Sequence, residues 1–546
     1  MINIKAIAFS LSLALIPQGV PPPGAPQGSA VLTGVVARVD NDKPVPGALL
    51  QLQRQPATRD SLPIATRTDA SGAYRFEKIP AGSYVLLVSA PHHFPTDAAP
   101  GRPAGQGKRL DLADGQQLDA FNLQLVPSSA MEGRVLDEFG EPAPGVTMVA
   151  SQLMQVMGKS RLMPLPRTAV SDDRGSFRIS NLSPGDYYLL ALSGPFGMQG
   201  GAMLSTPADT RAGFAPTYFP GSGNAVDARP LRLAIGRDNV GLTFAMVPSR
   251  LFTVSGRVTD AGGASPAGSV QMLQTQGGDV RAIVPANLIV RANGTFAYRN
   301  VPQGSYVLQA RAGRNFGTAL VTVHDRDVAD IAIALQPPRT ARGHVTFEGG
   351  TPPPKEAVRI QVAPVDVVSG PVGGNALPPV RVNDDWTFEL PGLQSVGVVM
   401  ANAVPGWQLR RVTLGGEDIT DKPHDFRLRD VTGLEVVLSD RWASVVASVT
   451  DVAGNIASDC TVIVFSQDAA KWTWPSRHVV MGRTNQQGVF RIPALPAGGF
   501  LAVAVPQGIT TSAEVDAVVL ESLRGAAARL TLTEGQESSV SLTLVR

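Results

Sequence analysis

One phrase recurs five times along the chain and constrains its fold more than any other feature. In the first copy, Asp69-Ala-Ser-Gly72 leads to Tyr74 and Phe76, and an aliphatic residue follows three positions later. Side chains two residues apart lie on one face of a strand, so this spacing predicts a strand with one buried face. The five sets are Tyr74/Phe76/Ile79, Phe177/Ile179/Leu182, Phe296/Tyr298/Val301, Phe388/Leu390/Leu393 and Phe490/Ile492/Leu495. Such a repeat predicts a series of small domains rather than one large core.

The residues around each copy predict a β-hairpin. The Asx-x-x-Gly lead-in supplies residues that tolerate a left-handed turn. After Ile79, Pro80-Ala-Gly82 predicts a second turn, and Tyr84 resumes the alternation on a return strand. Four copies share this glycine and the aromatic after it: Gly82/Tyr84, Gly185/Tyr187, Gly304/Tyr306 and Gly498/Phe500. The fourth copy is degenerate, with Trp386 where the first turn glycine is expected. We interpret the repeated aromatics as core rather than ligand contacts.

Each copy lies between an opening and a closing strand. Openings such as Gly133-Arg-Val-Leu-Asp137 recur roughly 90 to 120 residues apart, a normal size for a small β-sandwich. The 45 prolines and 56 glycines agree with many short strands joined by turns. We therefore predict an all-β chain of five tandem sandwiches, joined by short linkers in an extended array. The expected domains are residues 31–127, 128–249 (with loop insertions), 250–338, 339–440 (degenerate) and 441–546.

Residues 1–30 read as an export signal followed by a proline-rich lead. Lys5 provides a positive start, residues 6–16 form a short apolar run, and Gly28-Ser-Ala30 resembles a small-residue cleavage site. The alternative is a disordered apolar tail. Export predicts a periplasmic, outer-membrane-associated or extracellular protein. No later stretch is expected to form a transmembrane helix.

Several function classes lack support in the sequence. The net charge is +2 and charges of both signs are interspersed, so no nucleic-acid partner is expected. The single cysteine, Cys460, precedes an apolar strand and is predicted to be a buried thiol. No nucleophile elbow, phosphate loop or zinc-protease motif occurs, so we predict no catalytic residue, metal or cofactor. One helix is expected at residues 517–527, capped by Asp516.

The phrase Asp-x-x-Gly-x-Tyr/Phe, the following Pro-x-Gly-x-Tyr and the Gly-Arg-Val-x-Asp openings resemble the carboxypeptidase regulatory-like domain. The resemblance is strong in copies one to three, moderate in the fifth and weak in the fourth. It implies Ig-like or transthyretin-like sandwiches that are not catalytic. Gly416-Glu-Asp-Ile-Thr420 and Tyr218-Phe-Pro-Gly221 are similar to exported multi-domain proteins of soil bacteria. The zinc-binding His-x-x-Glu pair of the carboxypeptidase itself is missing.

The candidate binding segment is Lys471-Trp472-Thr-Trp474-Pro-Ser-Arg477-His478. Two tryptophans at strand spacing share a face, and paired aromatics stack on sugar rings. The alternative is that they cover the core or pack on a neighbouring domain. Trp407 and Trp442 are expected at domain junctions. The methionine-rich loops at 154–163 and 194–203 are either adaptable surfaces or packing elements.

Three functions stay open at this level. The first is a non-catalytic scaffold or interaction protein of the cell envelope, with an envelope protein as partner. The second is a carbohydrate-binding protein that uses Trp472, Trp474 and Arg477 on a polysaccharide. The third, an enzyme with an unrecognised site, has no motif in its favour.

Overall fold

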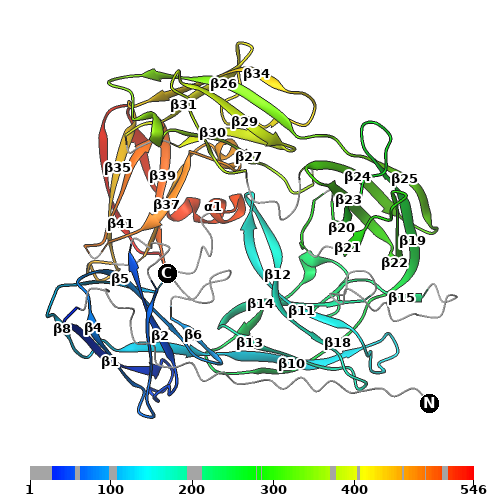
Figure 1. The fold of residues 1–546 in the computed structure, drawn as a ribbon, viewed down its shortest axis with the longest axis horizontal. Helices are drawn as coiled ribbons and strands as arrows, with labels where there is room; N and C mark the ends of the chain where they lie inside the picture. The colour runs from blue at the N-terminus through cyan, green and yellow to red at the C-terminus, as the bar shows by residue number, and fades with distance from the viewer. Residues whose placement is uncertain are drawn as a thin grey trace, which may run out of the picture. The chain divides into compact units, whose positions relative to one another are not determined.

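The computed structural model describes residues 28–55, 62–96, 107–193, 212–277, 279–283, 286–368, 370, 377–402, 406–457, 460–485, 487–506 and 515–545. Residues 1–27 of the expected export signal and the loop at 194–203 lie outside these residues, whereas Gly28 to Ala30 are described and Ala30 begins the first strand. Almost all regular structure is β-strand (Figure 1), which confirms the predicted fold class of multiple β-sandwich domains. The chain divides into two compact units, one built mainly on residues up to Ser129 and the other on the repeats that follow. No described helix is both long and apolar enough to cross a bilayer.

The described residues form ten sheets, two for each of the five repeats. In the first sheet of each repeat the opening strand lies between the strand of the aromatic phrase and the closing strand. These triplets are β4 (Ala73–Ile79), β1 (Ala30–Arg38), β9 (Leu123–Pro127); β13 (Ser176–Leu182), β10 (Ser129–Leu136), β18 (Asn239–Ala245); β22 (Thr295–Pro302), β19 (Pro248–Thr259), β25 (Val328–Ala334); β29 (Thr387–Leu393), β26 (Arg339–Glu348), β34 (Val431–Ser439); and β38 (Val489–Leu495), β35 (Ala443–Thr450), β41 (Glu537–Thr543). Opening and closing strands pair in parallel, so the two ends of each repeat meet inside one sheet.

The second sheet of each repeat packs its apolar face against the first. Its strands are, in order, β3 (Ile64–Arg67), β2 (Leu49–Gln55), β5 (Gly82–Ser89), β7 (Lys108–Leu112); β12 (Lys159–Val170), β11 (Thr147–Val156), β14 (Gly185–Leu192), β16 (Thr217–Tyr218), with β17 (Leu231–Leu233) also on β14; β21 (Ala286–Ile289), β20 (Ser269–Thr275), β23 (Gly304–Ala312), β24 (Asn315–Val323); β28 (Val380–Arg381), β27 (Arg359–Pro364), β30 (Val396–Asn402), β33 (His424–Asp425); and β37 (Val479–Arg483), β36 (Thr461–Ser466), β39 (Gly498–Val505), β40 (Ala528–Leu532). Short strands complete the edges: β6 (His93–Pro95), β8 (Gln117–Leu118), β15 (Ala212–Phe214), β31 (Gln408–Leu414) and β32 (Glu417–Asp418). We number the sandwiches first to fifth by their opening strands.

The repeated phrase is an arch between two sheets, and the predicted hairpin is wrong. β4 pairs with β1, whereas β5 pairs with β2 in the opposite sheet. The buried residues of the two strands therefore face each other across the core. A hairpin and an arch show the same alternation of apolar residues, so the local sequence does not distinguish them. The pairing partner of each strand, which is distant in sequence, makes the choice.

Tyrosine hydroxyls close two of these arches. The hydroxyl of Tyr84 donates to the carbonyl oxygen of Pro80 at 2.8 Å, and that of Tyr306 donates to Pro302 at 2.8 Å. These hydrogen bonds satisfy carbonyl groups at the point where the chain crosses between sheets. The aromatic phrase thus fills the core, as its apolar periodicity predicted, and it forms an arch in place of the predicted hairpin.

The turn before each phrase needs a left-handed residue, and the fourth copy uses a tryptophan. Trp386 has φ of 64°, close to the φ values of the glycines at the same place in the other copies. Those glycines are Gly72 (76°), Gly175 (69°), Gly294 (79°) and Gly488 (70°). The Trp386 ring packs on Phe347 with centroids 4.5 Å apart. An aromatic contact thus accompanies a backbone conformation that normally favours glycine.

Three further predictions concern Cys460, the helix after Asp516 and Trp407. Cys460 is 3% exposed, as predicted for a buried thiol. Helix α1 (Ala517–Leu523) is capped by the Asp516 carboxylate, which accepts from the Val518 amide at 2.9 Å, so the predicted helix is confirmed although it is shorter. Trp407 is not junction packing: it is 7% exposed and contacts Phe347 within the fourth core. This core is rich in aliphatic residues and accommodates the bulky ring.

Candidate functional site

The segment that the sequence singled out begins with a short helix rather than a strand. Trp472 ends the 3-10 helix η4 (Ala469–Trp472), which follows β36. Asp468 caps this helix by accepting from the Ala470 amide at 3.1 Å. Residues two apart share a face in a strand but not in a 3-10 helix. The expectation that Trp472 and Trp474 form a common platform is therefore wrong.

Trp472 is a core residue. Its side chain is 5% exposed, and its indole N–H donates to the carbonyl oxygen of Ser466 at 2.7 Å. The ring meets Phe465 edge-on at 5.4 Å, and the Arg524 guanidinium lies 4.8 Å from its centroid. Together with Leu520 of α1 it covers the outer face of β36 and β39. Because this ring is covered on both sides, it offers no open face to a sugar.

Trp474 is half-buried and lies just past the helix, in the loop that precedes β37. The Ser476 hydroxyl donates to the Lys471 carbonyl oxygen and thereby ties the two ends of this loop together. Carbohydrate binding through Trp474 stays a prediction. The predicted pairing with Trp472 no longer supports it.

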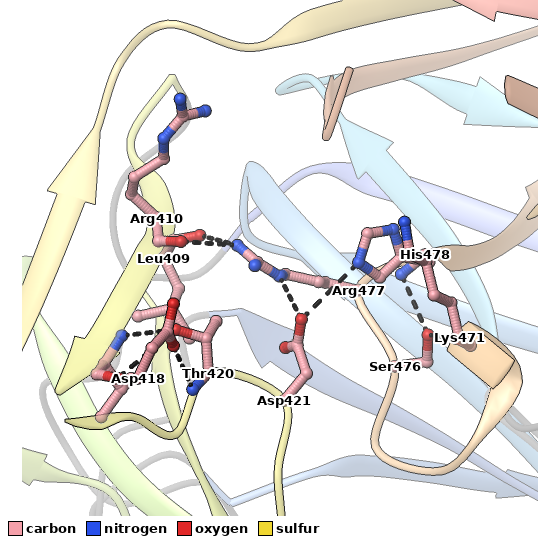
Figure 2. Close-up of polar contacts among 10 residues, drawn as sticks. Leu409, Arg410, Asp418, Thr420, Asp421, Lys471, Ser476, Arg477 and His478 are labelled. Carbon is pink, nitrogen blue, oxygen red and sulfur yellow. Dashed lines mark hydrogen bonds and ion pairs between the residues drawn. The ribbon is translucent and has the colours of Figure 1, made fainter. Parts of the chain in front are cut away.

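Arg477 connects the fifth sandwich to the fourth (Figure 2). Its Nε donates to Asp421 Oδ2 at 2.9 Å. Its Nη1 donates to the carbonyl oxygens of Leu409 and Arg410, the latter at 3.2 Å. The side chain is 26% exposed, so this charged group is largely withdrawn from water. A guanidinium with several fixed partners orients one domain surface against another.

Asp421 is the functional residue that the sequence reading missed. Its Oδ2 also lies 3.6 Å from His478 Nε2. Burial alone would raise the pKa of Asp421, but the neighbouring His478 imidazole and the positive charge and hydrogen bond of Arg477 lower it below its usual value. The carboxylate is therefore charged within the junction at neutral pH.

The Gly416-Glu-Asp-Ile-Thr420 motif places Asp421. The Asp418 carboxylate accepts from the Thr420 amide at 2.8 Å, and the Thr420 hydroxyl oxygen accepts from the Val412 amide at 2.8 Å. These bonds hold the β31–β32 turn against its own sheet (Figure 2). Asp421 follows with φ of 58°. A motif that is similar to those of exported multi-domain proteins is thus part of the junction between the fourth and fifth sandwiches.

Trp442 lies at the same junction, as predicted. Its indole N–H donates to the Ser439 carbonyl oxygen at 2.7 Å. The guanidinium groups of Arg410 and Arg477 lie 5.9 and 5.8 Å from its ring centroid. Both distances allow cation–π attraction. One ring therefore contacts an arginine of the fourth sandwich and one of the fifth.

A second polar junction joins the second sandwich to the third. Arg161 on β12 is fully buried and pairs with Asp279 at 2.9 Å. Its guanidinium also donates to the Val280 carbonyl oxygen. Beside it, the Leu162 amide donates to the Arg281 carbonyl oxygen at 2.8 Å. The β11–β12 ribbon thus adds backbone and side-chain bonds to a loop of the next sandwich.

Apolar contacts accompany these polar ones. Met157 and Met163 pack on a cluster that includes Val280 and Ile283, so this methionine-rich loop is a packing element. Burial alone would raise the pKa of Asp279, but the hydrogen bond from Lys159 and the charge of Arg161 lower it. Val149, Leu190, Leu192 and Tyr218 of the second sandwich belong to the same buried apolar cluster as the core of the third sandwich. The two sandwiches therefore share buried surface.

A third junction uses an amide. Gln309 on β23 is 3% exposed, and its Nε2 donates to the carbonyl oxygens of Val367 and Gly370 at 2.8 and 2.9 Å. Val367 and Gly370 belong to the fourth sandwich. Among the described residues no three His, Cys, Asp or Glu side chains lie close enough to hold a metal ion. Arg477, Arg161 and Gln309 thus each bond to a carboxylate or to backbone carbonyls of the neighbouring sandwich, and among the described residues Arg161 Nη2 is buried without a partner.

Comparison with known proteins identifies the first sandwich. Residues 31–125 match the family model of the carboxypeptidase regulatory-like domain, which confirms the predicted resemblance for that repeat. For the later repeats the resemblance stays a prediction. No curated protein matches the chain.

Solved structures of pilins are similar to this chain at low identity. The minor pilin of Streptococcus agalactiae is 13% identical over 40% of this chain and 96% of the pilin, with a TM-score of 0.24. The full-length major pilin of Corynebacterium diphtheriae is 9% identical over 57% and 98%, with a TM-score of 0.17. A full-length pilus protein of Streptococcus pneumoniae is 9% identical over 93% of each chain, with a TM-score of 0.16. At these scores the likeness carries no functional argument.

Proposed function

We propose that this chain is a non-catalytic, exported scaffold of the cell envelope, whose tandem sandwiches hold one another through buried polar junctions. The observation that carries the proposal is Arg477. It is the charged residue among the three predicted ligand contacts, and its guanidinium pairs with Asp421 and with backbone carbonyls of the preceding sandwich. A group engaged in this way positions a domain and is not free for a ligand.

The other junctions support the same function. Arg161 and Gln309 are fully or almost fully buried, and they also bond to a neighbouring sandwich. Burying such groups is costly unless every contact is well placed, so they stabilise one relative position of two surfaces over others. Fixed domain positions benefit a scaffold or adhesion protein. An enzyme needs reactive groups that converge in a pocket open to substrate.

Location tests the envelope part of the proposal. The full-length chain with a C-terminal tag is produced in the cells that encode it, and impermeant protease is added before and after the envelope is opened. We expect the tag in the envelope fraction. The opening step after which the protease cleaves the chain then shows which envelope layer encloses it. A chain recovered only from the cytoplasm would contradict export and the scaffold role.

A junction variant tests the scaffold part. Arg477→Ala removes the bonds to Asp421, Leu409 and Arg410, so we expect faster protease cleavage between Ser439 and Ala443 and weaker retention in the envelope. Arg491→Ala is the matched control, because the Arg491 side chain is 70% exposed and pairs only loosely with Glu537 at 3.7 Å. Unchanged envelope retention of Arg477→Ala would contradict the proposal. Retention on polysaccharide that is lost in Trp474→Ala would favour carbohydrate binding instead.

A further inference from the structure

Strand β24 (Asn315–Val323) is an open edge of the third sandwich. It pairs with β23 on one side through nine consecutive residue pairs without a bulge. It is the last strand of the order β21-β20-β23-β24, so among the described residues no strand is hydrogen-bonded to its other side. Val321 and Val323 face the core, whereas Thr318, Leu320 and Thr322 are exposed.

The backbone groups on the open side are available for pairing. Phe316 exchanges both of its backbone hydrogen bonds with Gln336, at 3.1 and 2.9 Å, so its N–H and C=O point away from β23. Backbone direction alternates along a strand, so those of Thr318, Leu320 and Thr322 point the same way. None of these three has a backbone partner on that side among the described residues. The unpaired part of the edge therefore begins after Phe316, the residue that pairs with Gln336.

This edge lacks the protection that natural edge strands usually carry. Charged side chains, prolines, bulges or short length normally prevent pairing with another chain. β24 reads Asn-Phe-Gly-Thr-Ala-Leu-Val-Thr-Val, with no charge and no proline. The opposite edge of the same sheet, β21, has only four residues. The edge strand β12 of the second sandwich carries Lys159, two arginines, two prolines and a register shift.

The edge is complementary to itself. Thr318-Ala-Leu-Val-Thr322 reads almost the same in both directions. If two copies pair antiparallel with Leu320 on the two-fold axis, Thr318 lies opposite Thr322 of the other copy. Each of the three residues then exchanges its N–H and C=O with the other chain. Thr–Thr pairs and an apolar pair across strands are stabilising.

We propose that β24 is a docking edge for a second copy of this chain, forming a two-fold dimer through Thr318, Leu320 and Thr322. Leu320 is 75% exposed in the single chain, and its side chain meets its own copy on the axis. An isologous contact of this kind uses one surface twice and closes on itself. The inference goes beyond the scaffold role and does not depend on it.

Sedimentation velocity of the full-length chain tests this proposal. Three residue pairs form a small interface, so we expect association in the range of about 1 to 1,000 μM. The weight-average mass should rise with concentration from 57.2 kDa towards twice that value. A mass that stays constant over this range would overturn the proposal.

Leu320→Lys and Ile289→Lys form a matched pair of variants. Leu320→Lys places two like charges opposite each other on the axis, so dimerisation should weaken at least tenfold while the exposed position keeps the fold intact. Ile289 is 82% exposed on β21, at the other edge of the same sheet, so Ile289→Lys should associate as the unaltered chain does. Equal effects of the two variants would overturn the proposal.

Disulfide trapping checks the register independently of affinity. Directly opposed residues in this geometry have Cα atoms about 5.5 Å apart, a separation that a disulfide spans. Leu320→Cys should therefore give a covalent dimer under mild oxidation, and Ile289→Cys should not. The natural Cys460 is 3% exposed and does not compete. Equal cross-linking at both positions, or none at Leu320→Cys, would overturn the two-fold pairing.

Discussion

The structural roles of individual residues in this protein do not follow from their chemistry alone. Trp472 resembles a ligand platform in the sequence and is buried under Arg524. Trp386 occupies a glycine position with a left-handed backbone. Asp421 is one carboxylate among many in the sequence, yet it pairs with Arg477 of the next sandwich. The role of each follows from what lies against it.

Trp386 provides a test of backbone strain. Replacing it by alanine removes the contact with Phe347 and keeps a left-handed residue that has a Cβ atom. Replacing it by glycine removes the same contact and also the strain. We therefore expect Trp386→Gly to unfold with a free energy about 1 kcal/mol higher than Trp386→Ala. Urea unfolding of both variants, followed by hydrogen exchange of β26 and β29, measures the difference. Equal stability would show that the φ of 64° is not strained here.

Buried tyrosines predict the behaviour in alkali. Burial raises the pKa of Tyr74, Tyr218, Tyr298 and Tyr306 above the ordinary value. The ordinary value, which applies to the unfolded chain, is about 10. A raised pKa in the folded state means that stability is fully present below pH of about 10 and declines as the pH rises further. Ultraviolet titration should show these tyrosines ionising only as the chain unfolds. Reversible ionisation of all seven tyrosines in the folded chain would contradict this.

At the level of elements, both connections and strands supply junction residues. The segment after β32 presents Asp421 and the loop after η4 presents Arg477, whereas Arg161 and Gln309 lie on the strands β12 and β23. Connections between strands leave side chains free of the core, and so do strand residues that point away from it. The arches between sheets have a different role, because their aromatic side chains fill the core of each sandwich.

The junction of the fourth and fifth sandwiches predicts a coupling between Asp421 and Arg477. We expect a double-mutant cycle with Asp421→Ala and Arg477→Ala to give a coupling of about 1–3 kcal/mol, since the bond is charge-assisted and largely buried. The lowered pKa of Asp421 means that this stabilisation is present above the unfolded pKa of about 3.9 and is lost as the pH falls further. Urea unfolding of the four proteins at pH 7 and pH 3 measures both effects. A coupling that is unchanged at pH 3 would contradict the assignment.

At the level of the whole molecule, neighbouring sandwiches of the second unit share buried contacts. One face of the second sandwich is buried in the apolar cluster of the third, and Arg161 pairs with Asp279 across the junction. The predicted extended array and the exact domain boundaries stay predictions. Small-angle scattering would test the first, and stable fragments from limited proteolysis would test the second.

Shared burial predicts that the second and third sandwiches unfold together. Arg161→Ala removes the buried partner of Asp279, which keeps its ion pair with Lys159 at 3.0 Å, so the change should cost about 1–3 kcal/mol at this junction. We therefore expect one hydrogen-exchange transition for β14 and β23 in the unaltered chain and two in the variant. Arg178→Ala is the control, because that arginine is 51% exposed and its ion pairs with Glu132 and Asp238 lie on the surface. A single transition in Arg161→Ala would contradict coupling through this residue.

The sequence by itself determined the sandwich modules. Apolar residues at a spacing of two, turn glycines and closing strands are local patterns, and they specify strands and buried faces wherever they occur. Tyr74, Cys460 and α1 are therefore placed as expected. The same patterns also identified the degenerate turn at Trp386 and the regulatory-like first repeat.

Only the tertiary structure decided which strands pair and what the polar residues do. The aromatic phrase forms an arch because β4 and β5 each pair with a strand that is distant in sequence. The alternation of apolar residues is the same in a hairpin and in an arch, so it does not distinguish them. Trp472 is buried because α1 and Arg524, some fifty residues onward in the chain, cover it. Arg477 binds Asp421 because folding brings two sandwiches together at that point. Burial and pairing depend on neighbours in space, and a linear pattern contains only neighbours along the chain.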